Sequence, residues 1–197
     1  MTTAQNQLLA QAFVQNRTGL DKLSLLSMAL LVIAGSIALT ISAHIKIPFY
    51  PVPVTMQTMV VLLIGMSYGP RLGGATIAAY LAQGAIGLPV FAGGAGLLYM
   101  AGPTGGYLAG FLISAVVVGF LAERGWGKTI INTALAMVVG NLVIYALGVG
   151  WLSNIIGFDK AITFGLMPFL YGDVLKIVIA AGLMPFAWNF VSKLTGK

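Results

Sequence analysis

The chain has 197 residues, of which 59% are hydrophobic and only 7% are charged, and its mean hydropathy is +0.99. A soluble domain carries about 25% charged residues, so this composition excludes a soluble protein and indicates an integral membrane protein. The formal net charge is +6, but the basic residues stand singly at the ends of apolar segments, so no nucleic-acid partner is expected. The chain has no cysteine and one histidine, His44, and therefore no disulfide, thiolate metal site, Cys nucleophile or histidine metal cluster is expected.

Long apolar segments predict six transmembrane helices of about 20 residues each. We expect residues 1–22 to form an N-terminal tail or leader, or a short surface helix, without an assigned function, and residues 23–197 to form a single six-helix membrane domain. Pro168 falls in the first turn of the last helix, where it is tolerated, and Pro185 is expected to kink that helix. The six predicted helices cover residues 23–43, 54–68, 72–86, 102–122, 129–150 and 164–191.

The connections between these helices differ in length and in charge. A tight turn is expected at Gly69-Pro70-Arg71, whereas residues 44–53, 87–102 and 151–163 form three longer loops. The side of the longer loops carries two basic residues, Lys46 and Lys160. The other side carries seven: Arg17, Lys22, Arg71, Arg124, Lys128, Lys193 and Lys197. The positive-inside rule then predicts cytoplasmic termini and outward-facing longer loops.

Two charged residues lie inside the last predicted helix. Asp173 and Lys176 are three residues apart and therefore share one helix face. A charge at membrane depth costs at least ~2.5–3.5 kcal/mol on insertion scales. The pair is either an ion pair that holds the packing or part of a polar ligand site, and the second interpretation is the default for a charge inside a membrane.

The fifth predicted helix carries two polar residues at a similar depth. Asn141 and Tyr145 are one turn apart, and Asn141 lies nine residues before Gly150 at the outer end of that helix. At ~1.5 Å per residue, Asn141 and Asp173 lie about 12–14 Å below the outer surface. Gln57, Tyr99 and Tyr107 belong to the same outer half, and together these residues predict a polar pocket that opens outward.

Two other classes of membrane protein find little support. A passive small-solute facilitator needs a polar path through the bundle, but the cytoplasmic half of every predicted helix is apolar.

An enzyme is not expected either. Gly127-Lys128-Thr129 lacks the glycine that a phosphate-binding loop requires five residues earlier, where Ala122 stands. An intramembrane aspartyl protease needs two carboxylates, and only Asp173 is at depth.

Small residues at a spacing of four form a flat strip in the first predicted helix. Ala34 and Ala38 would allow another helix backbone to approach closely. Spacing alone favours packing within the bundle. A similar strip in the fourth helix, which includes Gly106 and Gly110, predicts tight packing there.

Three segments resemble the BioY family, the biotin-specific substrate-binding S component of energy-coupling factor (ECF) transporters. They are PVPVTMQT at residues 51–58, GAIGLPVF at residues 84–91 and GPTGGYLAGF at residues 102–111. The three motifs in this order are specific, and the resemblance extends from about residue 23 to the C-terminus. It implies an all-α fold of six transmembrane helices of the ECF S-component type.

The resemblance also implies a function and its partners. It implies high-affinity capture of biotin from the outer face and biotin uptake as part of an ECF-type ABC importer in a prokaryotic plasma membrane. Biotin is then the transported ligand, and no cofactor or metal is expected. The implied partners are a membrane T component (EcfT) and two cytoplasmic ATPases, within the lipid bilayer. An S component for another small vitamin is the alternative.

The resemblance assigns roles to individual residues as well. Asn141, Asp173 and Lys176 match polar positions in the binding region of the family. Ala34 and Ala38 become residues of the interface with the T component. The complete expected biotin-binding set is Asn141, Asp173, Lys176, Tyr145, Gln57, Tyr99 and Tyr107.

Overall fold

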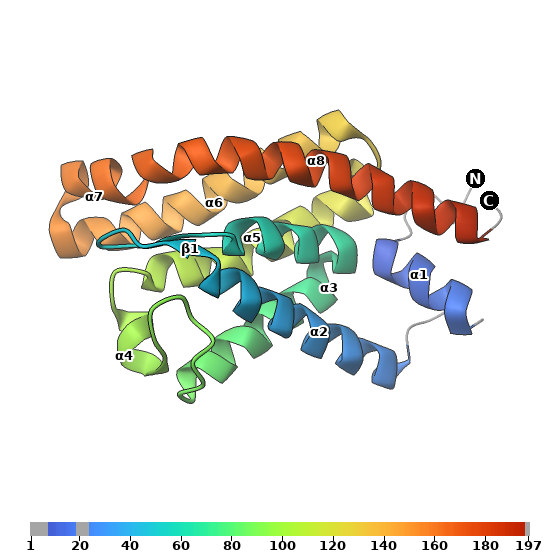
Figure 1. Ribbon diagram of the computed structural model, residues 1–197, viewed down its shortest axis with the longest axis horizontal. Helices are drawn as coiled ribbons and strands as arrows, with labels where there is room; N and C mark the ends of the chain where they lie inside the picture. Colours follow the sequence, from blue (N-terminus) through green and yellow to red (C-terminus); the bar gives the residue numbers. More distant parts are fainter. Residues whose placement is uncertain (1–7, 19–23, 196–197) are drawn as a thin grey trace.

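A computed structural model describes residues 8–18 and 24–195, which fold mainly into helices connected by short loops (Figure 1). The long helices are α2 (Leu25–His44), α3 (Gln57–Ala85), α5 (Gly105–Glu123), α6 (Ile130–Ile156) and α8 (Met167–Thr195). The shorter elements are α1 (Leu9–Thr18), α4 (Gly96–Ala101), the 3-10 helix η1 (Trp126–Lys128), α7 (Phe158–Gly165) and two strands, β1 (Lys46–Ile47) and β2 (Val54–Thr55).

Five segments of the described chain are long and apolar enough to cross a membrane. They are α2, α3, α5, α6 and the stretch Phe158–Lys193, which joins α7 to α8. The predicted all-α, multi-pass membrane protein is therefore confirmed at the level of fold class. Pro168 lies in the first turn of α8, and Pro185 lies inside that helix without ending it.

The helix α3 consists of two arms that fold back on each other. Gly69 has a φ of 81°, which an L-residue with a side chain rarely adopts, and Pro70 follows it without a backbone N–H. The arms touch through glycines, because a Cβ built on Gly73 would lie 3.1 Å from Cα of Gly65. Figure 1 shows the reversal from the first arm to the second. The predicted turn between residues 54–68 and 72–86 is thus correct.

The described part of residues 1–22 includes the short helix α1, one of the alternatives that the sequence leaves open, and the side chain of Leu8, just before it, packs against Gly69. One loop prediction was wrong. The expected loop 151–163 is mostly helical, since α6 continues over residues 151–156, which contain neither glycine nor proline, and stops at Gly157 with a φ of 85°. Leu152 in this extension is fully buried, so packing stabilises the extra turn.

The remaining two loops contain short regular elements. Strands β1 and β2 pair antiparallel, with Lys46 opposite Thr55 and Ile47 opposite Val54. The glycine-rich loop 87–102 contains α4. In Figure 1 the β1–β2 hairpin, α4 and α7 lie together at one end of the bundle, which we call the loop end. The N-terminal end of α2 and the C-terminal end of α8 lie at the opposite end.

The fourth predicted helix, α5, packs closely on both neighbours through its glycines. A Cβ built on Gly110 would lie 2.9 Å from Cα of Ile144 on α6, and one on Gly119 would collide with the backbone of Pro70 on α3. The predicted small-residue strip is confirmed as a packing surface. This close packing places the loop-end halves of α3, α5, α6 and α8 around a common interior.

Candidate functional site

A buried ion pair on α8 is the centre of the site. Asp173 and Lys176 are only 4% and 6% exposed, and Lys176 Nζ lies 3.0 Å from Asp173 Oδ1. Lys176 Nζ also donates a hydrogen bond of 3.0 Å to Thr58 Oγ1 on α3. The hydroxyl of Tyr145 on α6 donates to Asp173 Oδ2. These four residues, from three helices, form a continuous network that we call the polar cluster.

The polar cluster is stable inside the bundle because the negative charge of Asp173 and the positive charge of Lys176 compensate each other. Removing two charges from water costs several kcal/mol per ion, and this cost is offset only by good geometry and additional hydrogen bonds. Here Tyr145 and Thr58 supply those bonds. An ammonium has three N–H donors. Among the described residues Lys176 uses two, so the cluster retains a donor on Lys176 and acceptor capacity on Asp173.

Asn141 lies one turn from Tyr145 on the same face of α6. It is 7% exposed, and its Oδ1 is buried without a hydrogen-bond partner among the described residues. Such atoms are rare in folded proteins, and each one requires a physical explanation. A carboxamide that both donates and accepts is therefore available beside the polar cluster.

A small cleft separates the polar cluster from the loop end. Its volume is about 30 Å³, well below the roughly 300–1,000 Å³ of a small-molecule site, so a ligand requires the loops or side chains above it to move. The aromatic wall includes Tyr107 and Phe169, whose ring centroids are 6.0 Å apart. The lining residues are Val52, Pro53, Thr55, Gln57, Thr58, Ala92, Tyr99, Thr104, Tyr107, Phe111, Tyr145 and Phe169.

Two outer loops cover this cleft. The β1–β2 hairpin contributes Val52 and Pro53, and the glycine-rich loop contributes Ala92. The two loops are joined by Lys46, whose Nζ donates to the carbonyl oxygen of Ala92. We call this hydrogen bond the loop clip.

Three predicted site residues have structural partners of their own. Gln57 Nε2 donates to the hydroxyl of Tyr80 over 2.7 Å. The hydroxyl of Tyr107 donates to Gly165 O over 2.6 Å. Tyr99 stacks on Phe91 with ring centroids 5.2 Å apart. Gln57, Tyr99 and Tyr107 thus line the cleft and also hold its walls in position.

The predicted residues therefore form two adjoining groups. Asn141, Tyr145, Asp173 and Lys176 lie together, and Gln57, Tyr99, Tyr107 and again Tyr145 line the cleft.

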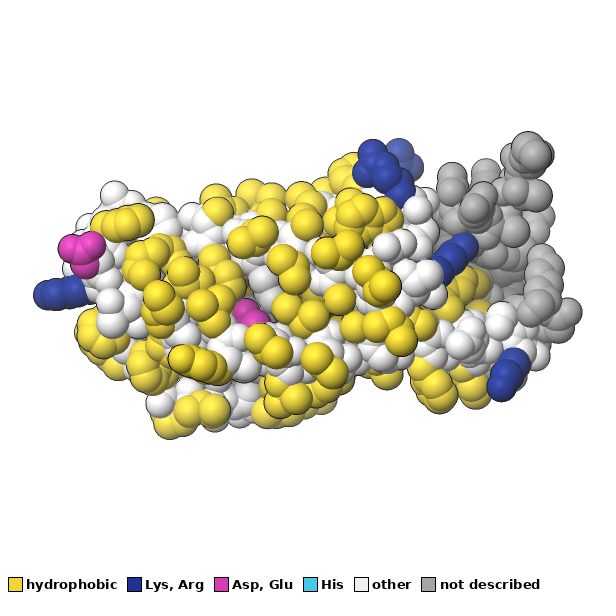
Figure 2. Space-filling model, turned by 90° about the horizontal axis from the view of Figure 1, so that it is seen from above, with side chains coloured by type: hydrophobic (Ala, Val, Ile, Leu, Met, Phe, Trp, Pro, Cys, Tyr) yellow, Lys and Arg dark blue, Asp and Glu magenta, His cyan; other side chains and the backbone are white. Residues whose placement is uncertain are grey.

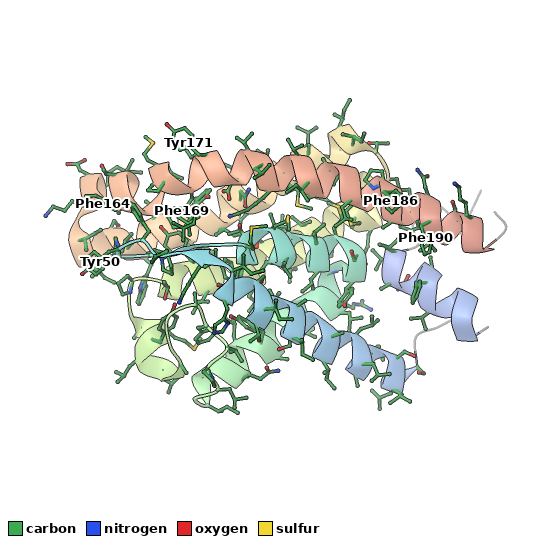
Figure 3. The ribbon with its side chains drawn as sticks, viewed as in Figure 1. Tyr50, Phe164, Phe169, Tyr171, Phe186 and Phe190 are labelled. Atoms are coloured by element: carbon green, nitrogen blue, oxygen red, sulfur yellow. The ribbon has the colours of Figure 1, made fainter. Side chains whose placement is uncertain are left out.

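Sequence reasoning missed Thr58 and Phe169 as candidate site residues. Thr58 belongs to the motif at residues 51–58, which was a usable signal. Phe169 had one too, because it lies four residues before Asp173 and therefore shares the helix face of the ion pair. Figure 3 shows Phe169 on the inner side of α8 and Tyr171 on its outer side, in agreement with exposures of 4% and 86%.

A second, larger cavity lies on the other side of the polar cluster. Its volume is about 640 Å³, and Asn141, Tyr145 and Asp173 belong to its lining. The other lining residues are apolar and come from α6, α7 and α8. It opens at the side of the bundle rather than beneath the loops, so its size alone does not make it the ligand site.

The predicted strip on α2 faces away from the bundle. Ala34 and Ala38 are exposed, whereas Gly35 and Ser36 between them are buried. A Cβ on Gly35 would collide with the side chain of Thr76, so the contact between α2 and α3 runs through Gly35. Ala34 and Ala38 therefore do not serve the internal packing that their spacing alone favoured.

Comparisons with known proteins give a consistent result. The BioY family profile matches residues 14–193. The protein named biotin transporter BioY from Thermotoga maritima is 44% identical over 148 residues, which cover 73% of this chain and 85% of that protein. The protein named probable biotin transporter BioY from Pyrococcus horikoshii is 41% identical over 150 residues, which cover 75% and 88%.

The fold also resembles a solved structure, the crystal structure at 2.1 Å of the S-component for biotin from an ECF-type ABC transporter. The TM-score is 0.71 at 23% sequence identity, and the match covers 85% of this chain and 95% of that chain. This likeness concerns the fold. The profile match over residues 14–193 and the relatives above 40% identity decide the family, and the chain belongs to the BioY family.

Proposed function

We propose that this protein binds biotin at the outer face of a membrane and serves biotin uptake as the S component of an ECF-type ABC importer. The observation that carries the proposal is the buried polar cluster beneath the outer loops of a BioY-family fold. Relatives of the chain are named biotin transporters, and the similar crystal structure is an S-component for biotin. The role is that of a transporter component and not of an enzyme.

The proposed topology has six membrane crossings in the cell membrane. The crossings are α2, the two arms of α3, α5, α6 and α8. Lys46 and Lys160 lie toward the loop end, and the other described basic residues outside the polar cluster lie toward the opposite end, which supports cytoplasmic termini. Figure 2 likewise shows basic side chains near both ends of one face and none across its middle.

In the proposed site, biotin enters the cleft when the outer loops open. Its ureido N–H groups donate to Asp173, and its ureido oxygen accepts from Asn141. The apolar ring contacts the aromatic wall of Tyr107 and Phe169. We assign Lys176 to neutralising Asp173, because its Nζ is already held by Asp173 and Thr58.

The proposed partners are a membrane T component and two cytoplasmic ATPases. The exposed strip of Ala34 and Ala38 on α2 supports a helix interface there, since small side chains permit close approach. Large apolar residues flank the strip, including Ile33, Ile37 and Ile41, each more than half exposed.

A double substitution tests the site without leaving a single buried charge. Asp173→Asn/Lys176→Gln keeps the cluster neutral. It should purify normally yet bind biotin at least about tenfold more weakly, since one hydrogen bond to a charged group is worth about 1.5–3 kcal/mol. Biotin affinity is measured by calorimetry on the purified protein.

The matched control is Asp159→Asn/Lys160→Gln, which removes an exposed pair of charges on α7. It should bind biotin as the wild type does. The assignment of Lys176 is tested by comparing the affinity for biotin with the affinity for biotin amide, which lacks the carboxylate charge. If Lys176 only neutralises Asp173, the ratio of these two affinities should be the same in Lys176→Gln as in the wild type. Wild-type affinity in the Asp173→Asn/Lys176→Gln variant would move the biotin site away from the cluster.

A further inference from the structure

Tyr80 lies in the second arm of α3, behind the wall of the biotin cleft. Its side chain is fully buried, and it does not belong to the residues that line the cleft. Its hydroxyl donates a hydrogen bond of 2.8 Å to the carbonyl oxygen of Val90 in the glycine-rich loop. The same hydroxyl oxygen lies 2.7 Å from Nε2 of Gln57, and Gln57 lines the cleft. Tyr80 is therefore connected to the cleft through Gln57 rather than directly.

The directions of these hydrogen bonds follow from the atoms involved. A backbone carbonyl oxygen only accepts, so the single hydrogen of the Tyr80 hydroxyl is used by Val90. The hydroxyl oxygen must then accept from Gln57, which requires Nε2, and not Oε1, to face Tyr80. With the carboxamide turned over, two oxygen acceptors would lie 2.7 Å apart with no hydrogen between them. The hydrogen-bond network thus fixes the orientation of this carboxamide.

The oxygen end of the carboxamide belongs to the cleft. Oε1 of Gln57 lies 3.4 Å from Oγ1 of Thr55, a long hydrogen bond, and Thr55 also lines the cleft. Oγ1 of Thr55 accepts from the backbone N–H of Gln57, which leaves its own hydrogen for Oε1. This corner of the cleft therefore offers oxygen lone pairs to a ligand. The hydroxyls of Tyr107 and Tyr145, which line the cleft as well, likewise donate to protein acceptors.

We propose that Tyr80 is a positioning residue that makes the cleft reject a ligand with an oxidised sulfur ring, because it holds Gln57 with Oε1 toward the ligand. This inference rests on the proposed binding of biotin. An oxygen added to the ring sulfur carries lone pairs and no hydrogen, so it meets Gln57 Oε1 without a donor between them. Burying an acceptor without a donor is unfavourable. The thioether of unoxidised biotin is only a weak acceptor. Tyr80 thus contributes to selectivity by excluding a competitor.

The test compares the affinities for biotin and for biotin sulfone, whose sulfur carries an oxygen on each face of the ring. Calorimetry on the purified wild type should give at least about tenfold tighter binding of biotin. Tyr80→Phe keeps the aromatic ring and removes the hydroxyl, so Gln57 can turn its Nε2 toward the cleft. The ratio of the two affinities should then fall at least about fivefold. A general loss of support would weaken both ligands alike, and an unchanged ratio would therefore overturn the proposal.

A double-mutant cycle tests whether Tyr80 acts through Gln57. Gln57→Met keeps the length of the side chain and removes the carboxamide, so the affinity ratio should fall at least about threefold. An unchanged ratio in Gln57→Met would make the rejection of the sulfone steric and refute the proposal, even if Tyr80→Phe did not fold. Adding Tyr80→Phe to Gln57→Met should change the ratio less than about twofold, because no carboxamide remains to be oriented. An equal effect of Tyr80→Phe with and without Gln57 would also refute it.

Ser36→Ala is the matched control. Ser36 Oγ donates to Gln83 Oε1 over 2.8 Å, a hydroxyl–carboxamide contact between α2 and the second arm of α3, and neither residue lines the cleft. Both affinities should stay within about twofold of the wild type, and a change of their ratio as large as in Tyr80→Phe would overturn the proposal. A wild type that binds biotin and biotin sulfone equally would refute only the role of Tyr80. A wild type that binds neither ligand would refute the proposed function as well.

Discussion

At the scale of single residues, the polar cluster depends on hydroxyl groups as much as on its charges. Asp173 and Lys176 are paired at 3.0 Å, but each also has a neutral partner, Tyr145 or Thr58. Partners of this kind orient a charge without adding another one. A ligand that replaces or extends these bonds is therefore recognised by hydrogen-bond direction rather than by net charge.

Thr58→Val tests this role of a neutral partner. The substitution keeps the shape of the side chain but leaves a buried N–H of Lys176 without an acceptor. The free energy of unfolding should fall by about 1.5–3 kcal/mol, the value of a hydrogen bond to a charged group. Denaturant titration in mixed micelles measures it.

Thr76→Val is the matched control for Thr58→Val. Thr76 is also buried, but within the described residues its hydroxyl bonds only to the backbone oxygen of Leu72 in its own helix. Its loss should cost less than about 1 kcal/mol. If both substitutions have equal effects, Thr58 does not support the charge of Lys176.

At the scale of elements, the outer loops act together as the cover of the cleft. The β1–β2 hairpin has only two residues in each strand, and the glycine-rich loop contains only the short helix α4. An isolated hairpin of this size is marginally stable. The loop clip from Lys46 to the carbonyl of Ala92 joins the two loops. Opening of the cleft should therefore require this bond to break.

Lys46→Met tests the loop clip, because it keeps the aliphatic stem and removes the donor. Biotin release should become about 5- to 10-fold faster, as expected for the loss of about 1–1.4 kcal/mol in a partly exposed hydrogen bond. Hydrogen exchange in residues 46–53 should slow when biotin is added to the wild type, and slow less in the variant. Lys160→Met, at the same end of the bundle, should release biotin at the wild-type rate. If Lys46→Met leaves the rate of biotin release unchanged, the loop clip does not control the opening of the cleft.

At the scale of the whole molecule, the bundle has two ends with different properties. The loop end carries the cover and the cleft, and the opposite end carries most of the described basic residues outside the cluster. The exposed strip on α2 runs along the side, away from the cleft beneath the loops. Ligand binding and partner binding can therefore be changed separately.

The orientation of the two ends can be measured in intact cells. In the cysteine-free chain, Lys160→Cys should react with a membrane-impermeant thiol reagent, whereas Lys128→Cys should react only after the membrane is opened. This follows from the excess of basic residues on the side of Lys128. The reverse labelling pattern would invert the proposed topology.

The role of the α2 strip can be separated from biotin binding. Ala38→Trp places a large ring on the exposed strip and should abolish uptake and co-purification with the T component. Biotin affinity of the isolated protein should stay within about twofold of the wild type, since the strip does not line the cleft. The control is Ala109→Trp, an exposed position on α5, which should retain assembly. If Ala38→Trp weakens biotin binding and leaves assembly intact, the strip packs within the bundle and does not form the interface with the T component.

The sequence by itself determined the membrane class, the long helices, the turn at Gly69 and the family. These follow from local properties: apolar length, the backbone freedom of glycine beside proline, and motifs read along the chain. It also identified Asn141, Tyr145, Asp173 and Lys176 as a group, because residues one turn apart share a helix face and helix ends set a common depth.

Only the tertiary structure decided what these residues touch. Thr58 became the acceptor of Lys176 across 118 positions in the chain, and no periodicity reports a contact between distant helices. Likewise α6 continued past Gly150 because Leu152 is buried against the bundle, and Ala34 and Ala38 turned outward because Gly35 occupies the contact with α3. Which face a helix turns toward the bundle, and the residue at which the helix ends, depend on packing against neighbouring helices. This packing is a property of the assembled bundle.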